Sequence, residues 1–292
     1  SVLSLALFVV IELEVADPLL DIGIFRYGAF VHSLVLISLM TVVMFGVLFY
    51  VPQFLQVVQG WGALDSGLAL LPQAAVMGVL MPIAGRIYDR FGPRWPVSAG
   101  LAIAALGCYL LHTITIDTSR GHLMLLLSVQ AAGIGLAMMP IFTSGIAAIP
   151  VAQSNIASAF NNVVRNVSGA LGVAVLTTIL TMQRAELLAG RAALLPANTP
   201  TPVLGPPGTP AWLGQYATYQ LTQLRVFAGA IDNVFLICAV LSFIGAVGGL
   251  LMRSGPAPAV PPARASAAPA TGRGVRPEPR PATAPGQQLV DV

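Results

Sequence analysis

Residues 121–164, GHLMLLLSVQAAGIGLAMMPIFTSGIAAIPVAQSNIASAFNNVV, contain no Asp, Glu, Lys or Arg. Two further stretches, 27–64 and 233–252, are also free of these residues. An α-helix needs about 20 apolar residues to cross the roughly 30 Å hydrocarbon layer of a bilayer. Each stretch is long enough, so we predict an all-α protein that crosses the membrane several times.

The overall composition excludes an ordinary soluble domain. Of the 292 residues, 56% are hydrophobic and only 9% are charged, whereas a soluble domain carries about 25% charged residues. Every basic residue is Arg, and the tail that holds several of them has few aromatic residues, so we predict no nucleic-acid binding. Cys108 and Cys238 lie inside apolar runs without metal-ligand or disulfide spacing, which indicates inert buried thiols and no metal site.

The apolar runs divide the chain into three parts. Residues 1–28 read as the end of a membrane helix, over about 1–12, followed by a short polar connection. The opening run lacks the basic residues of a secretory signal, so we expect further sequence upstream. Residues 29–252 form a predicted six-helix transmembrane bundle, and residues 253–292, rich in Pro, Ala and Arg, form a predicted disordered tail. The six predicted spans lie near 30–55, 66–86, 95–114, 122–149, 155–181 and 229–252.

The arginines predict how the bundle is oriented, because an arginine excess marks the cytoplasmic side. One set of connections and the tail hold nine: Arg26, Arg86, Arg90, Arg94, Arg253, Arg264, Arg273, Arg276 and Arg280. The opposite set holds four: Arg120, Arg184, Arg191 and Arg225. We therefore expect the 86–94 loop and the C-terminus in the cytoplasm and the 182–228 connection outside. Within that connection, 192–212 is predicted to be irregular and 211–226 to be an amphipathic surface helix.

The block Gly85-Arg86-Ile87-Tyr88-Asp89-Arg90-Phe91-Gly92-Pro93-Arg94 carries the strongest local signal. Gly85 permits close helix approach, and Asp89 can pair with an Arg or cap a neighbouring helix. Gly92 allows a turn with positive φ. We interpret Gly85, Asp89, Arg90, Gly92 and Arg94 as a conformational latch between two helices. The alternative is a basic turn without a gating role.

This block resembles the signature loop of the major facilitator superfamily, with Gly85, Asp89, Arg90, Gly92 and Arg94 at its fixed positions. Trp95 replaces a final base that many members carry. The stretch 48–94 is similar to the 14-helix drug:proton antiporter branch throughout, including Pro52–Gln53, Gln56, Gly60, Gly67 and Leu71–Pro72. Two further runs resemble later helices of that branch. One is Gln130-Ala-Ala-Gly133-Ile-Gly135 with Met139–Pro140, and the other is 158–172 with Asn161, Asn162 and Arg165.

Arg165 is a candidate for the translocation path. It lies about 12–16 Å along its predicted helix, and a cation at a helix centre costs about 2.5–3.5 kcal/mol on insertion scales. Ser158, Asn162, Arg165, Gly169 and Gly172 share one face at helical spacing. The alternative is an Arg that extends to the interface and fixes helix packing. The other path candidates are Asn161, Gln53 and Gln56, of which the two glutamines can equally face an outer vestibule. Gly133, Gly135, Pro140 and Pro72 are predicted packing or hinge positions.

Acidic side chains are scarce in the predicted spans. Asp232 begins the last predicted span, and we interpret it as a solvated acid at a helix start, with proton exchange as the alternative. His32, His112 and His122 lie near span ends without a catalytic partner at useful spacing. No phosphate-binding glycine loop supports ATP-driven transport, and we predict that the chain is not an enzyme.

The resemblance implies a function. It predicts the C-terminal part of an antiporter that exports amphipathic drugs in exchange for protons, with the proton gradient as energy source and no cofactor. The expected partners are a missing N-terminal half, an amphipathic small molecule and the lipid of the plasma membrane. An exporter of a dedicated metabolite and a membrane scaffold without transport remain alternatives.

Overall fold

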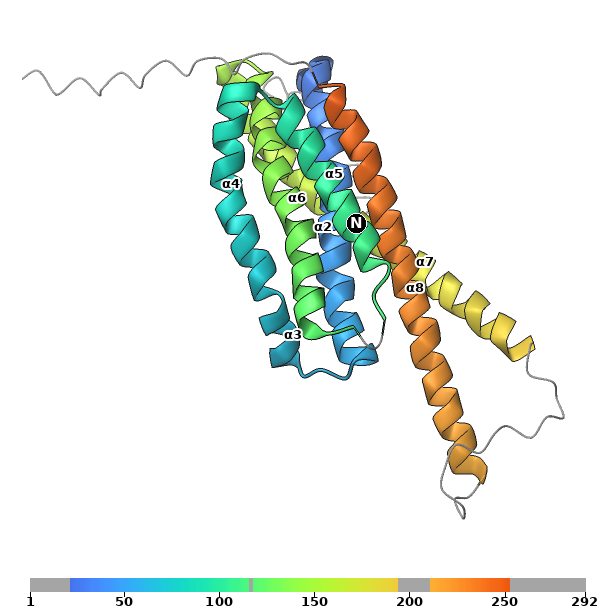
Figure 1. The fold of residues 1–292 in the computed structure, drawn as a ribbon. Helices are drawn as coiled ribbons and strands as arrows, with labels where there is room; N and C mark the ends of the chain where they lie inside the picture. The colour runs from blue at the N-terminus through green and yellow to red at the C-terminus, as the bar shows by residue number, and fades with distance from the viewer. Residues whose placement is uncertain (1–21, 116–117, 194–210, 253–292) are drawn as a thin grey trace, which may run out of the picture. The chain divides into compact units, whose positions relative to one another are not determined.

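The computed structural model describes residues 22–115, 118–193 and 211–252, and within these ranges all regular structure is helical (Figure 1). The elements are η1 (Ile22–Arg26), α2 (Gly28–Gln53), η2 (Phe54–Val58), α3 (Ala63–Ala69), α4 (Leu71–Phe91), α5 (Arg94–Leu111), α6 (Arg120–Ala147), η3 (Val151–Gln153), α7 (Ser154–Ala193) and α8 (Ala211–Leu250). The all-α prediction is confirmed. The predicted partial span over 1–12 and the predicted disordered tail 253–292 lie outside the described residues.

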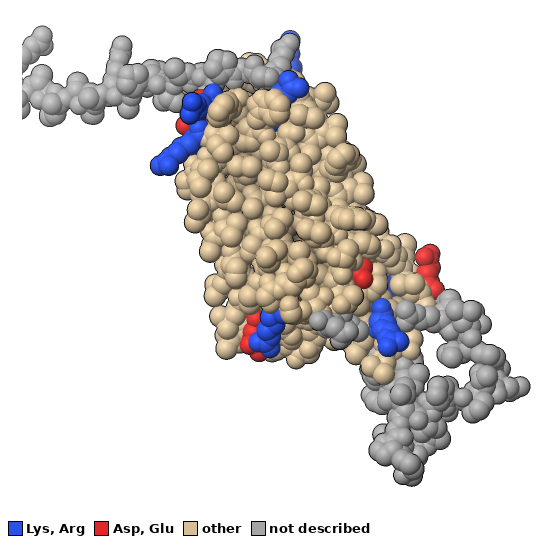
Figure 2. Space-filling model, in the orientation of Figure 1, with Lys and Arg blue, Asp and Glu red and all other residues tan. Residues whose placement is uncertain are grey.

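Six helical segments are long and apolar enough to cross a membrane. They are Gly28–Val58, Ala63–Phe91, Arg94–Leu111, Arg120–Ala147, Ser154–Leu188 and Leu221–Leu250. In Figure 1 successive segments run in opposite directions, so the connections alternate between the two ends of the bundle. On the face drawn in Figure 2, charged atoms gather toward these two ends and leave a broad uncharged belt between them. A bilayer can solvate such a belt, whereas water cannot.

Helices α7 and α8 are longer than the sequence predicted. Each has 40 residues, which is about 60 Å at 1.5 Å per residue and twice the hydrocarbon thickness. The predicted spans ended at 181 and began at 229. The segment 211–226, predicted as a separate surface helix, is the first part of α8, so the connection between the two helices is shorter than expected. The connection itself, 194–210, lies outside the described residues.

Two breaks interrupt the first two spans. Pro52 lies near the end of α2, and the chain continues as the π-helix η2; a proline removes one backbone donor from the helical ladder. The predicted span over 66–86 is divided at Leu70 into α3 and α4, with Pro72 in the first turn of α4. That position suits proline, because the first N–H groups of a helix have no partner within it.

Helices α5 and α6 pack backbone against backbone. A Cβ atom added at Gly133 would lie 2.7 Å from the Cα of Ala104, and one added at Gly100 would lie 2.7 Å from the carbonyl oxygen of Gly133. Gly107 makes the same kind of contact farther along, where its Cβ would lie 2.6 Å from the Cα of Gln130. In lipid, helix association depends on such close van der Waals packing between small residues.

The six spans differ strongly in how much of their surface is covered. Helices α2, α5, α6 and α8 bury about half of their apolar windows, whereas α4 and α7 bury far less. In α4 only Ala84 and Tyr88 are buried. The latch block predicted from the sequence lies at the end of α4, and Arg165 lies on α7, so both sites belong to the two least covered helices.

Candidate functional site

The block 85–94 forms the tight connection between α4 and α5. Helix α4 ends at Phe91, Gly92 adopts φ 75° and ψ −177°, and α5 begins at Arg94. The Gly92 N–H donates a 2.8 Å hydrogen bond to the carbonyl oxygen of Tyr88. Residues with a Cβ atom essentially never occupy this backbone region. Gly92 therefore has the positive φ that the sequence predicted.

An open hollow of about 470 Å³ lies beside the block. Its lining residues are Gly78, Met81, Pro82, Gly85, Arg86, Asp89 and Met139. Since Met139 belongs to α6 and the others to α4, the hollow lies along the line where these two helices meet. A Cβ added at Gly85 would lie 4.0 Å from the side chain of Met139, so this glycine brings the helices into ordinary contact without forcing their backbones together.

The charged side chains of the block make no ion pair with the part of the chain that the structure describes. Asp89 and Arg90 are exposed, and the guanidinium carbon of Arg90 lies 5.5 Å from the ring centre of Phe91. Arg94 is half-buried, and its Nε atom is buried without a hydrogen-bond partner among the described residues. The pairing of Asp89 with an Arg within this bundle, expected from the sequence, is therefore not found there. The latch role of the block stays a prediction.

The polar residues in the first turns of α7 differ in burial. Asn161 is fully buried, and both polar atoms of its side chain lack hydrogen-bond partners. Asn162 is exposed, and Arg165 is half-buried without a hydrogen bond or ion pair to any described residue. Ser158 donates a 3.0 Å hydrogen bond to the carbonyl oxygen of Ser154.

The predicted polar face of α7 divides into two parts along the helix. Gly169 and Gly172 pack against α2, where added Cβ atoms would lie 3.1 Å from the ring of Phe45 and 2.7 Å from Val42. Ser168 Oγ donates a 2.9 Å hydrogen bond to Ser38 Oγ on α2. The glycine end of the predicted stripe is thus a helix contact, and the open polar surface is confined to the part that holds Asn162 and Arg165.

The remaining predicted residues lie at separate places in the bundle. Gln53, at the end of α2, and Gln56, in η2, are both exposed. Gly135 faces α4, since a Cβ there would lie 3.3 Å from the Cα of Met77. Pro140 is buried inside α6. The structure does not bring Gln53 and Gln56 into contact with Arg165 through any hydrogen bond among the described residues.

Asp232 is not at a helix start, which corrects the prediction from the sequence. Helix α8 begins at Ala211, so Asp232 lies 21 residues beyond its first residue. The carboxylate is half-buried, and its Oδ1 atom is buried without a hydrogen-bond partner among the described residues. The Nδ1 atom of His112, at the end of α5, lies 2.9 Å from the backbone carbonyl oxygen of Asp232.

A family model describes the chain. The model of the Major Facilitator Superfamily matches residues 9–173, which is more than half of the sequence. The chain belongs to the major facilitator superfamily. The latch block, the α5–α6 glycine contact and most of the open face of α7 all lie within the matched range. The chain is therefore a membrane-spanning protein of a transporter family.

Several members of the superfamily are similar to this chain. The uncharacterized MFS-type transporter YhcA of Bacillus subtilis is 38% identical over 179 residues, which are 61% of this chain and 34% of YhcA. The lincomycin resistance protein LmrB of Listeria innocua is 33% identical over 178 residues, 61% of this chain and 38% of LmrB. The multidrug resistance protein Stp of Mycobacterium tuberculosis is 31% identical over 176 residues, 60% of this chain and 32% of Stp. The aligned part thus spans about a third of the length of these relatives.

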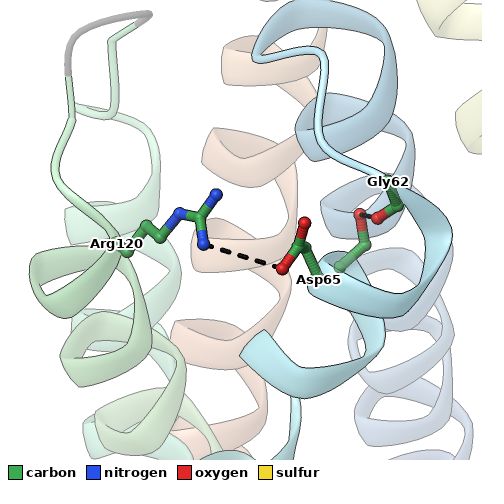
Figure 3. A network of polar contacts seen from close by, with 4 residues as sticks. Gly62, Asp65 and Arg120 are labelled. Atoms are coloured by element: carbon green, nitrogen blue, oxygen red, sulfur yellow. Dashed lines mark hydrogen bonds and ion pairs between the residues drawn. The ribbon is translucent and has the colours of Figure 1, made fainter.

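This major facilitator chain also has a polar contact that the sequence did not predict (Figure 3). Arg120, at the start of α6, faces Asp65 of α3, with 3.7 Å between Nη1 and Oδ1. Its guanidinium carbon lies 4.3 Å above the ring centre of Trp61, and Gln59 Nε2 donates to the carbonyl oxygen of Thr118 at 3.3 Å. These contacts connect the segment before α4 with the segment before α6, at the opposite end of α4 from the latch block.

Some buried positions of the superfamily fold could have been found from a sequence pattern. Gly100 and Ala104 are four residues apart on α5, which is the small-residue spacing of close membrane-helix pairs. Gln130 is fully buried, with both polar side-chain atoms unpaired among the described residues, yet no local pattern distinguishes it from an exposed glutamine. Among the residues that the structure describes, no three His, Cys, Asp or Glu side chains gather to hold a metal ion.

Proposed function

We propose that this chain is the C-terminal half of a proton-driven antiporter that exports amphipathic small molecules. An N-terminal half of the same transporter would be its partner, and the proton gradient across the plasma membrane would supply the energy without a cofactor. The arginine distribution puts the 86–94 loop and the C-terminus in the cytoplasm in this proposal.

The open polar face of α7 is the observation that carries the proposal. Asn162 and Asn166 are exposed there, and Arg165 between them is half-buried. Arg165 lies 11 residues after Ser154, which is about 17 Å into the helix. A cation facing lipid at that depth costs about 2.5–3.5 kcal/mol or more. Arg165 has no partner among the described residues, so we propose that this face borders a water-filled path shared with the other half.

The second uncovered helix, α4, supports the same arrangement. Its hollow beside Gly85 is open and mostly apolar, and the charged residues in its lining, Arg86 and Asp89, have no ion-pair partner among the described residues. In transporters built from two helical bundles, access alternates as one bundle rocks against the other around a central site. We propose that a segment of the N-terminal half occupies this hollow when the cytoplasmic side is closed.

The proposed substrate class rests on the relatives. LmrB of Listeria innocua is named for lincomycin resistance and Stp of Mycobacterium tuberculosis for multidrug resistance. A path lined by small, polar and aliphatic side chains suits amphipathic molecules better than highly charged ones, because the face offers one cation and no acid. We therefore propose amphipathic antibiotics or dyes as substrates.

Dye transport in inverted membrane vesicles tests the proposal. The chain is expressed together with the N-terminal half, and a protonophore is added to collapse the gradient. We expect gradient-dependent dye uptake into the vesicles, and we expect the chain expressed alone to give none. Arg165→Ala should lower the transport rate about tenfold, equivalent to about 1.4 kcal/mol of barrier.

Arg184→Ala is the matched control, because it removes the same side chain from the same helix at an exposed position bonded to Gln223. It should leave transport within about twofold of the unchanged protein. Equal rates for Arg165→Ala and Arg184→Ala would remove the argument for a path along α7. Transport by the chain alone would refute the proposed role as one half of a transporter.

A further inference from the structure

Asp232 is an isolated acid in the last membrane span. Between Val226 and Met252 it is the only charged residue. It precedes Leu250, the last residue of α8, by 18 positions, which is about 27 Å of helix. Since the hydrocarbon layer is about 30 Å thick, Asp232 lies close to its far boundary. This boundary is at the end of the bundle opposite the 85–94 block, which the proposed function places outside the cell.

Apart from Asn233, the neighbours of Asp232 on α8 are apolar. Ile231, Val234 and Phe235 are fully buried, and the Oδ1 atom of Asp232 is buried without a hydrogen-bond partner among the described residues. Burying an ionised carboxylate without a compensating donor is costly, whereas the neutral acid loses much less solvation. The site therefore favours a carboxyl group that can gain and lose a proton over one that is permanently ionised.

His112 is the second titratable group at this place. Its Nδ1 atom lies 2.9 Å from the carbonyl oxygen of Asp232, and because a carbonyl oxygen can only accept, Nδ1 carries the hydrogen. In the neutral ring, Nε2 then keeps its lone pair and can bind a proton. The hydrogen bond fixes the imidazole of α5 against the turn of α8 that holds the carboxylate, so the charges of the two groups influence each other.

Few other ionisable groups contribute to this end of α8. The elements packed against it are α2, η2, α5 and α7. In this half of the bundle they supply Tyr50 from α2, Cys108, Tyr109 and His112 from α5, none from η2, and Arg184 and Glu186 from α7, with Arg225 and Cys238 on α8 itself. Tyr50 shares a hydrogen bond with Thr177, and Arg184 is bonded to Gln223. His112 is thus the ionisable side chain that the described contacts join directly to Asp232.

We infer that Asp232, together with His112, is a proton-binding site of this half of the transporter, loaded from the side opposite the 85–94 block. The inference rests on the proposed antiport. A proton from the outer water adds to the Asp232 carboxylate to form the neutral acid, while the imidazole of His112 stays bonded to the backbone carbonyl oxygen of the same residue. Release of the proton toward the cytoplasm restores the carboxylate, so no other reactant is needed.

The test separates net proton movement from substrate movement. Asp232→Asn mimics the permanently protonated acid. In reconstituted vesicles of the complete transporter, we expect it to lower gradient-driven export about tenfold or more. Substrate counterflow, which exchanges labelled for unlabelled substrate without net proton transfer, should stay within about twofold of the unchanged protein. Asp232→Glu should restore part of the gradient-driven export.

Two further variants complete the experiment. Asp65→Asn is the matched control, since it makes the same change at an exposed carboxylate at this end of the bundle, and it should leave both activities within about twofold. His112→Gln removes the imidazole that the hydrogen bond holds against the turn of α8 that carries the carboxyl group. We expect it to shift the pH profile of gradient-driven export, and an unchanged profile would remove His112 from the site.

The outcomes distinguish this inference from the proposed function. If Asp232→Asn keeps gradient-driven export, or loses export and counterflow equally, the carboxylate is not the proton site. If a protonophore has no effect on the unchanged transporter, the proposed antiport itself fails. Labelling with dicyclohexylcarbodiimide, which adds to a protonated carboxyl group in apolar surroundings to form an acylurea, then decides the site alone. Labelling of Asp232 that falls as pH rises supports the site, and absent labelling overturns it.

Discussion

A single methyl group at Gly133 should disturb the closest helix contact in the bundle. In Gly133→Ala the new Cβ would lie 2.7 Å from the Cα of Ala104 and 2.5 Å from the carbonyl oxygen of Gly100. Ordinary contact between carbon atoms is about 3.5–4.0 Å. Both opposing atoms belong to the backbone of α5 and cannot rotate away, so α5 must retreat from α6 by about an ångström.

The loss of folding stability in Gly133→Ala can be estimated from the packing on either side of this contact. Ala104, Ile134 and Ala137 are buried in one cluster across this contact, and a gap of 0.5–1 Å forfeits about a quarter to a half of the dispersion attraction between facing atoms. Overpacking costs about 1–3 kcal/mol, and a close backbone contact belongs at the upper end. Inside a helix, alanine is about 1 kcal/mol more stabilising than glycine, and every Gly→Ala control variant shares this contribution.

The assay is thermal unfolding of the detergent-solubilised protein, with Gly78→Ala as control. Gly78 lies inside α4 with no atom within 4 Å of its added Cβ, so Gly78→Ala has the higher helix propensity of alanine without a steric clash. We expect Gly133→Ala to melt about 6–12 °C below Gly78→Ala, from about 3 kcal/mol at 2–4 °C per kcal/mol. Equal melting temperatures would falsify the close α5–α6 contact as the structure describes it.

Three other outcomes follow from the described contacts. Gly92→Ala should destabilise the protein by about 1–3 kcal/mol, because φ 75° with ψ −177° is a glycine conformation; Gly28→Ala, with open space at its Cβ, is the control in the same melting assay. Asp89→Asn should change the free energy of unfolding by less than about 0.5 kcal/mol, since the side chain is exposed and has no ion pair among the described residues. The same variant should lower dye export severalfold, and unaltered export would remove the latch assignment. A double-mutant cycle with Asp65→Asn and Arg120→Gln should give a coupling free energy of unfolding below about 1 kcal/mol, because both side chains are about half exposed. Added salt should lower this coupling energy. A larger coupling energy that does not change with salt would contradict the prediction.

The spans could be predicted because hydrophobicity in a membrane protein acts over whole helices. Runs such as 121–164 contain no charged residue, and α6 lies within that run apart from its first residue, Arg120. The turn at Gly92 could be predicted for a local reason, since only glycine tolerates its backbone angles. In both cases the deciding physics lies within the segment itself.

What the sequence could not predict depends on contacts between helices. Asp232 was interpreted as an acid at a helix start because the run without charged residues begins at Asn233 and the predicted span near 229, whereas the residues before them belong to the same helix, which begins at Ala211. Helical spacing selected Asn162 together with Arg165, but the neighbours of α7 bury Asn161 instead. The pairing of Asp65 with Arg120 joins positions 55 residues apart in the chain, which no periodic pattern encodes.

The length of α7 and α8 bears on how this protein can be handled in the laboratory. Each helix is about twice as long as the hydrocarbon layer is thick, and Arg184 of α7 donates a hydrogen bond to Gln223 of α8 near the last residue of one apolar span and the first residue of the other. A detergent micelle covers most of the bundle, so little protein surface is left for an antibody fragment to bind or for the alignment of particle images. These two helix ends offer an asymmetric landmark outside the micelle, and a binder selected against them would mark one side of the membrane in every particle image.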